Sequence, residues 1–457
     1  MSKTYRSWNP HQQWRLPPSP QDWLPQNDLV YFLVDTVNAL DLSAITQKYE
    51  QEERGYPPYH PRRMVALLFY AYCRGLFSRR KIMQACEERL TFRVIVGDAI
   101  PDFRTIGDFR KRHLKELSDL FLQVLRLCQE AGLVKLGHLA LDGTKLKANA
   151  SRHKAMSYGR MKEEEERLRG EIQEFLAQAE AVDGQEDQDH GADCRGDELP
   201  QELARRASRL KRIQEAKKAL EAQAKAAAEQ TRQEQEQEHE EREDVSGKRG
   251  RRAQEASEVP SERKQYNFTD PESKIMKTSN KGWDQCGNAQ AAVDGHKQII
   301  VACDVTDQPN DKQPFAPMLT QAQGNVGPQH KIEGASADSG YYREANVEYA
   351  ESQGIDAYLA TERLKHTDRV AKCPRGRMPK DLTGKEKMAR KLRTKKGRQR
   401  YSRRKCIVEP VFGQIKRARG FIQFSLRGLA KMRGEWSLVC LTHNLLKLFA
   451  APCTTAA

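Results

Sequence analysis

His138-Leu-Ala-Leu-Asp142-Gly-Thr-Lys-Leu-Lys-Ala-Asn149 is the stretch that decides the fold class. Before it the apolar residues recur at helical spacing, and here they begin to alternate, which is typical of strands. The Gly143-Thr144 pair resembles a turn, so the stretch predicts two short strands joined as a hairpin. Asp142 is then expected at the end of the first of these strands.

The same pattern recurs further along the chain. Lys331-Ile-Glu-Gly-Ala-Ser-Ala-Asp338 reads as a strand that ends at Ser339-Gly340. Alternation and apolar runs predict further strands, and helical spacing predicts the segments between them. The predicted strands cover 288–294, 298–305 and 355–360, and the predicted helices cover 313–323, 343–353, a segment around Glu409 and 430–449. Strands and helices in this order predict an α/β fold with a mixed sheet.

Asp142 and Asp338 hold equivalent places, each at the predicted end of an apolar strand and before a small turn. Ligands of open α/β sheets bind at the carboxyl ends of the strands. Carboxylate oxygens are ligands that suit Mg²⁺ or Mn²⁺. The two aspartates therefore predict a metal site. Asp304, Asp307 and Asp311 are further acids nearby, and they either support that site or form a turn, with the turn preferred.

Glu409 is the only acidic residue between Glu386 and Glu435. A lone acid in a basic segment weakens the binding of a polyanion unless it has another role, and metal ligation is such a role. The alternative is a local salt bridge to Arg404 or Lys405. If the helix continues regularly past Pro410, Gly413 and Lys416 lie on the same face as Glu409.

Asp142, Asp338 and Glu409 together supply enough oxygen ligands for two divalent ions. Two such ions clamp the attacking and leaving oxygens of an in-line displacement at phosphorus. The expected cofactor is therefore Mg²⁺, with two ions bound, and Mn²⁺ can substitute. This chemistry requires no covalent protein nucleophile.

The charge of the chain is concentrated near its C-terminus. The 457 residues carry a formal net charge of +15, and residues 361–436 alone hold 25 Lys and Arg against 6 Asp and Glu. The rest of the chain is slightly acidic. A basic block of this kind predicts contact with nucleic acid, because bound phosphates release counterions. Its candidate contacts include Lys395 and Lys396; a solubilising surface is the alternative.

The ten cysteines form no C-x-x-C pair, which argues against structural zinc and favours a reducing compartment. The first residues lack an apolar signal core, and no stretch approaches 18 apolar residues. We therefore expect a cytoplasmic protein without membrane contact.

Residues 28–132 carry helical spacing throughout and predict an all-helical domain. Two short segments, capped by Ser78 and Thr105, appear as helices that begin with basic residues. Such helix starts can bind DNA backbone or enter the major groove. A plain structural bundle is the alternative. The candidate DNA contacts in this domain are Arg79, Arg80, Lys81, Arg110 and Arg112.

Residues 155–262 are dominated by Glu, Gln, Lys, Arg and Ala and interrupt the α/β pattern. We expect a helical hairpin or coiled coil with a disordered end. It is either a spacer or an arm for oligomerisation or DNA contact. Residues 1–27 are expected to be an irregular arm and 450–457 a tail, leaving 133–154 and 263–449 as the α/β domain.

Three segments carry a resemblance to a known family. Leu141-Asp-Gly-Thr-Lys145, Ala337-Asp-Ser-Gly-Tyr341 and Ile407-Val-Glu-Pro-Val-Phe-Gly-Gln-Ile-Lys416 resemble the active-site segments of DDE transposases of bacterial insertion sequences. Within that family the chain is most similar to the group numbered eleven-eighty-two, related to the four and five groups. Phe103-Arg-Thr-Ile-Gly-Asp-Phe-Arg110 resembles that group's N-terminal domain.

The resemblance implies a ribonuclease-H-like catalytic fold. It implies binding to terminal inverted repeats, hydrolysis at the element's ends and strand transfer into target DNA. It further implies a bacterial, nucleoid-associated protein that acts as a homodimer in a synaptic complex. Related transposases hold DNA with a Tyr, a basic residue and a Lys near the glutamate, for which Tyr401, Arg404 and Lys416 are the candidates. The spacing departs from that pattern, since Lys405 stands four residues before Glu409.

Two other functions remain open from the sequence. One is a catalytically silent DNA-binding regulator of the same descent. The other is a metal-dependent DNA nuclease that cuts without strand transfer. The presence of all three carboxylates favours an active enzyme, and the resemblance along the whole chain favours transposition.

Overall fold

The computed structural model describes most of the chain. Most of the expected N-terminal arm and C-terminal tail, and parts of the insert and the basic block, lie outside the described residues. The described residues are 19, 22–51, 57–190, 201–243, 257–278, 282–362, 373–376, 379 and 382–451. They form two compact units: one holds Met1–Asn149, Met276–Gly282 and Cys286–Ala457, and the other holds Ala150–Ile275 and Trp283–Gln285.

The first unit begins with helices. They are α1 (Leu29–Ala39), α2 (Ser43–Glu50), α3 (Pro61–Cys73), α4 (Arg79–Glu88), α5 (Leu90–Val96), α6 (Phe103–Arg112) and α7 (Leu114–Glu130). Helix α3 is the centre of this group: Pro61 begins it, and from Met64 onward every residue is buried. It packs against α1, α5 and the C-terminal helix α14 (Leu429–Phe449).

Two details of these helices correct the sequence prediction. Helix α6 is capped by Asp102, whose side chain accepts from the Arg104 N–H, and not by Thr105, which lies inside the helix. Arg110 and Arg112 consequently stand in the last turn of α6 and do not begin a helix. Basic residues there complement the negative end of the helix dipole. Ser78 does precede α4, but its side chain makes no capping hydrogen bond.

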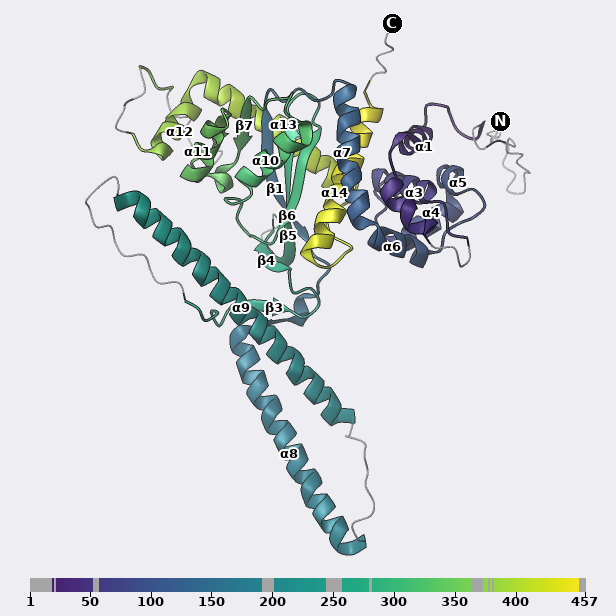
Figure 1. The fold of residues 1–457 in the computed structure, drawn as a ribbon, viewed down its shortest axis with the longest axis vertical. Coiled ribbons are helices and arrows are strands. Elements are labelled where there is room, and N and C mark those ends of the chain that lie inside the picture. The colour runs from purple at the N-terminus through teal and green to yellow at the C-terminus, as the bar shows by residue number, and fades with distance from the viewer. Residues whose placement is uncertain are drawn as a thin grey trace, which may run out of the picture. The chain divides into compact units, whose positions relative to one another are not determined.

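The sheet of the first unit is mixed, as expected (Figure 1). Its strands are β1 (Leu139–Lys147), β4 (Lys274–Lys277), β5 (Trp283–Asp294), β6 (Ile300–Thr306), β7 (Gly334–Ala337) and β8 (Asp356–Leu359). The order is β4-β5-β1-β7-β8, with β6 also paired to β5. Strand β5 is antiparallel to β1 and β6, whereas β7 runs parallel to β1 and β8.

The predicted hairpin at Gly143-Thr144 is wrong, because β1 is one continuous strand. It pairs with β5 without interruption, from Leu139 opposite Asp294 to Lys147 opposite Cys286. A long antiparallel partner pairs with the whole stretch, which favours one continuous strand. Glycine is tolerated in a strand where other groups approach it closely. Asp142 therefore lies within β1 and not at its end.

Helices of the first unit cover the sheet. They include α10 (Phe315–Val326), α11 (Glu344–Ser352), α12 (Gly384–Arg393) and α13 (Lys395–Gly413), which continues into the π-helical turn η4 (Gln414–Ala418). Helix α13 packs against β1, β7 and β8, and α14 packs against β6 and α7 (Figure 1). Trp436 of α14 is fully buried and donates to the Gln290 carbonyl at 2.9 Å, so α14 belongs to the core.

The second unit is a pair of long helices beside a small sheet. It contains η2 (Arg152–Lys154), β2 (Ala155–Ser157), α8 (Tyr158–His190), α9 (Gln201–Glu243) and β3 (Gln265–Asn267). Both helices extend further than the sequence pattern predicts, and α9 continues well into the segment expected to be disordered. Ala, Glu, Gln, Lys and Arg are strong helix formers, which favours the extension even without an apolar face. A core that includes Met161, Leu168 and Leu220 joins the two helices.

Among the described residues, no single helix is long and apolar enough to cross a membrane. The bent pair α1 and α2, which meet at 72°, reaches that length and composition only when taken together.

Candidate active site

The register of the sheet brings Asp142 and Asp338 together. Strands β1 and β7 are parallel neighbours, with Leu139 opposite Ala335 and Ala140 opposite Ser336. Two residues further along this register, Asp142 is adjacent to Asp338. Neighbouring strands lie about 4.8 Å apart, so the two carboxylates start from adjacent positions on one face. The equivalence expected from the sequence is thus real, although only Asp338 follows the end of its strand.

Asp142 is a largely buried carboxylate with one cation beside it. Its Oδ1 accepts from the Gly143 N–H at 2.9 Å, and its Oδ2 accepts from Arg404 Nη1 at 2.9 Å. Burial raises the pKa of Asp142 to about 6. Arg404 opposes that change, and the negative charge of Asp338 adds to it. The electrostatic effect of Asp338 agrees with its position beside Asp142.

Arg404 and Tyr401 stand on one side of α13 and complete this cluster. Burial disfavours the charge on Arg404, but Asp142, Tyr401 and Asp338 outweigh it and raise its pKa. The guanidinium carbon lies 6.0 Å from the centre of the Tyr401 ring. Burial raises the pKa of Tyr401 as well. Among the described residues, no hydrogen-bond partner meets the Nε of Arg404, which is buried.

Asp338 is fixed by the turn that follows it. Its Oδ1 accepts from the Gly340 N–H at 2.9 Å and caps the short helix η3 (Ser339–Tyr341). A side chain at Gly340 would place its Cβ 3.0 Å from Asp338 Oδ1 and 3.2 Å from Asp311 Oδ2. Glycine leaves room here for the two carboxylates, which would have to shift slightly for a larger residue.

Asp311 makes contacts that the preferred sequence interpretation, a simple turn, does not predict. It accepts from Asn288 Nδ2 at 2.6 Å and Gln290 Nε2 at 2.8 Å, and Lys145 Nζ lies 3.4 Å away. A Cβ at Gly143 would meet Asp311 Oδ1 at 2.8 Å. The turn interpretation preferred from the sequence misses these contacts, because Asn288 and Gln290 on β5 are distant in the chain. Asp311 is a third carboxylate beside the glycines of both aspartate motifs.

Lys416 reaches the same strand as Arg404. Its Nζ donates to Thr144 Oγ1 at 2.9 Å, and Thr144 lies on the same face of β1 as Asp142. The regular helix assumed from the sequence does not continue to Lys416, because the π turn η4 starts at Gln414. A π turn holds more residues per turn and rotates the following side chains. The regular helix on which the predicted alignment of Lys416 with Glu409 depended is therefore interrupted before Lys416.

Glu409 is exposed on α13, between Arg404 and Lys416 in the sequence. Within the described part of the chain its carboxylate forms no ion pair and no hydrogen bond, so the alternative salt bridge to Arg404 or Lys405 is not formed. Arg404 instead pairs with Asp142. No group of three His, Cys, Asp or Glu side chains among the described residues is placed to hold a metal ion.

The aspartate pair nevertheless fits a divalent cation. The donors are all carboxylate oxygens, the set that Mg²⁺ and Mn²⁺ prefer. Burial is the main cause of the raised pKa of Asp142. The adjacent carboxylate of Asp338 adds a repulsion between two negative charges. A cation between them would remove it. Asp142 and Asp338 are the residues that would hold such an ion.

The predicted DNA contacts of the helical region are only partly exposed. Arg80, Lys81 and Arg112 are exposed, and Arg79 is half-buried beside the Phe103 ring. Lys395, Lys396 and Lys405 are also exposed, and Lys396 lies 3.6 Å from Asp356.

Arg110 corrects the prediction that it is an exposed contact. It is only 5% exposed, and its Nη1 donates to Tyr72 Oη and the Phe77 carbonyl, both at 2.9 Å. Glu435 of α14 lies 3.9 Å away. Arg110 is therefore a buried link between α6, α3 and α14.

Two family models match the chain. A transposase domain (DUF772) matches residues 18–112, and the transposase DDE domain matches residues 212–445, more than half of the chain. The second match includes Asp338 and Glu409, whereas Asp142 precedes it. Comparison with curated proteins and with solved structures gave no match. The mixed sheet agrees with the ribonuclease-H-like fold of DDE enzymes, which act on DNA and generally use divalent metal ions. The chain belongs to the DDE transposase family of insertion sequences.

Proposed function

We propose that this transposase binds the terminal inverted repeats of its element, cleaves DNA at the element's ends and joins the 3′-hydroxyl ends to target DNA. The observation that carries this proposal is the adjacency of Asp142 and Asp338 on parallel strands, with Arg404 compensating their charge. Such a pair is costly to bury and has no structural purpose that an apolar pair would not serve better. It is explained by a role in binding a metal ion.

In this proposal Asp142, Asp338 and Glu409 hold Mg²⁺, with two ions bound and Mn²⁺ as a substitute. When bound, the ions supply Lewis-acid stabilisation to the attacking and leaving oxygens of the phosphodiester. Asp311 accepts from Asn288 and Gln290 on β5, and its carboxylate lies close to Gly340 in the turn after Asp338.

Basic side chains around the aspartates bind the DNA. Arg404 places its positive charge beside the aspartates, and Lys416 can exchange its bond to Thr144 for a phosphate oxygen. Tyr401 lies beside Arg404 and limits the orientations of its guanidinium. These groups orient the scissile phosphate against Asp142 and Asp338, which supplies the proximity that an in-line displacement requires.

Exposed basic residues extend the contact away from the site. They comprise Lys395, Lys396 and Lys405 of α13, and Arg80, Lys81 and Arg112 of the helical region. We assign 28–132 to DNA binding, 133–154 with 263–449 to catalysis and 155–262 to an inserted arm. Transposition brings two DNA ends together, so the active form in this proposal is a homodimer in a synaptic complex. A DNA substrate of this kind places the protein at the bacterial nucleoid.

A catalytically silent regulator is the second candidate. The observation that favours it is Arg404, which occupies one oxygen of Asp142 while Glu409 stays apart from both aspartates. Such a protein would bind the element's ends without cutting them.

The deciding experiment uses a labelled duplex that carries the element's end, a target plasmid, and Mg²⁺, Mn²⁺ or EDTA. Metal-dependent nicking at the end, followed by transfer of label to the plasmid, supports the transposase. Cutting without joining supports a nuclease, and tight binding without cutting in either metal supports the regulator. Asp142→Asn and Asp338→Asn should lose cutting, whereas Glu351→Gln, which changes an exposed acid elsewhere, should cut normally.

A further inference from the structure

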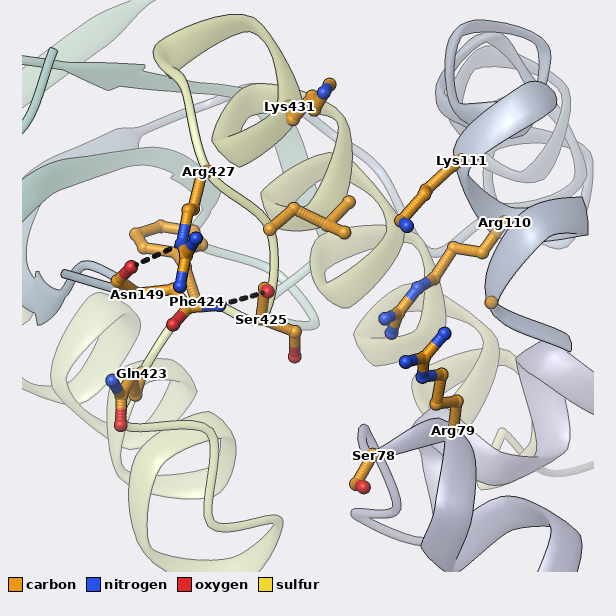
Figure 2. A pocket seen from close by; sticks show the side chains of 12 residues that line it. Ser78, Arg79, Arg110, Lys111, Asn149, Gln423, Phe424, Ser425, Arg427 and Lys431 are labelled. Atoms are coloured by element: carbon orange, nitrogen blue, oxygen red, sulfur yellow. Dashed lines mark hydrogen bonds between the residues drawn. The ribbon is translucent and has the colours of Figure 1, made fainter. Parts of the chain in front are cut away.

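A basic cleft lies between the helical region and the C-terminal part of the first unit (Figure 2). Its volume is about 720 Å³. Figure 2 shows Arg79, Arg110 and Lys111 on one wall, and Arg427 and Lys431 on the other. The residues that line it are Ser78, Arg79, Gly107, Arg110, Lys111, Asn149, Gln423, Phe424, Ser425, Leu426, Arg427 and Lys431.

The lining of this cleft is strongly positive. Five of the twelve lining residues are Arg or Lys, and none of the twelve is acidic. Arg427, Lys431 and Lys111 are exposed, so their charges face solvent. Arg110 is buried in the wall, where Glu435 lies 3.9 Å away and offsets its charge, so the exposed side chains supply the positive field. Clefts lined by one sign of charge concentrate ligands of the opposite sign.

One wall of the cleft is held rigidly. The segment from Phe421 to Arg427 is anchored to β1, since Lys147 N donates to the Ile422 carbonyl at 3.2 Å and Phe424 N donates to the Lys147 carbonyl at 2.8 Å. Glu435 accepts from the N–H groups of Ser425 and Leu426 at 2.8 and 3.1 Å.

Asn149 closes the wall: its Nδ2 donates to the Ser425 carbonyl at 2.7 Å, and its own carbonyl accepts from Arg427 Nε at 2.9 Å. These bonds hold Arg427 with its terminal N–H groups available in the described part of the chain. A positive side chain fixed before binding loses less entropy when a ligand arrives.

The chemistry of the lining favours a phosphate backbone as the ligand. Phe424 is 1% exposed, so it presents no ring face on which a base can stack. The amides of Asn149 and Gln423 already donate to the Ser425 and Ala148 carbonyls. What remains for a ligand is a set of cationic N–H donors, which bind phosphate without reading sequence.

Strand β1 connects the cleft to the candidate active site. Asp142 lies within β1, Lys147 ends it, and Asn149 follows in the cleft wall. At about 3.4 Å per residue, the path from Asp142 to the cleft is roughly 20 Å. Duplex DNA rises about 3.4 Å per base pair, so this distance corresponds to roughly six base pairs.

We propose that this cleft binds the backbone of double-stranded DNA roughly six base pairs from the phosphate at Asp142 and Asp338. The inference rests on the proposed function for the position of the reacting phosphate. The contacts are Arg79 and Lys111 from one wall and Arg427 and Lys431 from the other. The cleft thereby aligns the DNA with the aspartates through two separated contacts, and its binding is independent of sequence.

The test measures binding in EDTA, which separates it from cleavage. Fluorescence anisotropy gives the affinity for a duplex longer than the distance between the cleft and the aspartates, over a range of NaCl concentrations. R427Q/K431Q should bind roughly tenfold more weakly, and its salt slope should fall by about two, because two phosphate contacts are lost. R427K/K431R keeps both charges and should keep the slope.

The matched control is K115Q/K331Q, which removes two exposed positive charges outside the cleft. It should retain the wild-type slope. Thermal melting confirms that each variant is folded. An unchanged slope in R427Q/K431Q, or an equal loss in the control, overturns the proposal.

The position of the contact is tested with K431C, cross-linked to duplexes that carry one activated phosphate at successive positions of the element's end. Cross-linking should peak roughly six base pairs from the cleavage position. A peak at the cleavage position itself, or equal yields everywhere, contradicts the alignment. If wild type binds through the cleft but never cuts, the proposed function fails alone; if it cuts while R427Q/K431Q keeps its slope, the cleft proposal fails alone.

Discussion

Asp142 lies within β1, and Asp338 directly follows β7, the strand that pairs with β1, while Glu409 lies on a helix that changes its geometry five residues later. Sheet pairing brings the two aspartates together, and Arg404 lies beside the carboxylate of Asp142. Glu409 is exposed and, among the described residues, makes no polar contact. In the proposed site, the two aspartates are therefore already adjacent in the free protein, whereas Glu409 makes no polar contact among the described residues.

This difference suggests a division of roles. The partly buried carboxylate of Asp142, whose pKa is raised mainly by burial, carries a cost in its charged form that persists until a cation arrives. An exposed glutamate costs nothing in the free protein. We infer that the aspartates bind metal first and that Glu409 joins them when DNA is bound.

The largest expected effect separates metal binding from catalysis. Asp142→Ala and Asp338→Ala should each lower cleavage by more than about 100-fold, since loss of a group that merely supports a metal ligand already costs up to that much. Both should also lose Mn²⁺ binding in the free protein, measured by calorimetry. Glu409→Ala should lose cleavage to a similar extent.

In the free protein, however, Glu409→Ala should bind Mn²⁺ within about twofold of wild type, because Glu409 is not yet a ligand. Retained cleavage in this variant would remove Glu409 from the site. Lost Mn²⁺ binding would show that all three carboxylates are already assembled without DNA.

The next effect concerns stability and pH. The pKa of Asp142 is about 6 in the fold against 3.8 ordinarily. A raised acid pKa means stability that is fully present below pH 3.8 and lost as the pH rises through about 6. At 1.36 kcal/mol per pKa unit, the loss is about 3 kcal/mol. The free energy of unfolding of Asp142→Asn, minus that of wild type, should grow by this amount between about pH 4 and pH 7 in EDTA.

Glu409→Gln is the control for this measurement. Its difference from wild type should stay constant over the same range. A flat difference for Asp142→Asn would mean that Arg404 compensates Asp142 fully, and the preorganised pair would then carry no strain.

The association of Asp142 and Asp338 with strands could be predicted from the sequence, and the reasons are physical. Alternation marks strands because the side-chain period is two, and a motif that ends in Asp-Ser-Gly marks the end of a strand. These rules located Asp338 correctly and put Asp142 on the right strand. They failed at Gly143-Thr144, because pairing with β5 over nine residues overrides the local turn preference.

Features that depend on distant segments could not be predicted. Asp311 is held by Asn288 and Gln290 of β5, and Arg110 is buried by Tyr72 and Glu435, so no local pattern reveals either role. The π turn at Gln414 also has no signature in the helical period. It interrupts the regular helix before Lys416, whose Nζ donates to Thr144 Oγ1.

A smaller effect tests whether Lys416, which lies in that π turn, contacts DNA. Lys416→Gln should remove one phosphate contact, lowering DNA affinity uniformly across sequences and the salt slope by about one. Thr144→Val frees Lys416 from its present partner and should leave the slope unchanged. If Thr144→Val reduces the slope as much as Lys416→Gln, the bond to Thr144 is what orients the lysine toward DNA.

The smallest effect is the stability of Glu409→Gln, which should lie within about 0.5 kcal/mol of wild type by chemical denaturation. The control is Glu435→Ala, which leaves the Ser425 and Leu426 N–H groups and buried Arg110 without their acceptor and should cost about 3–5 kcal/mol. A loss for Glu409→Gln of comparable size would mean that Glu409 already has partners in the free protein. The contrast between a preorganised strand pair and a free helical glutamate would then no longer hold.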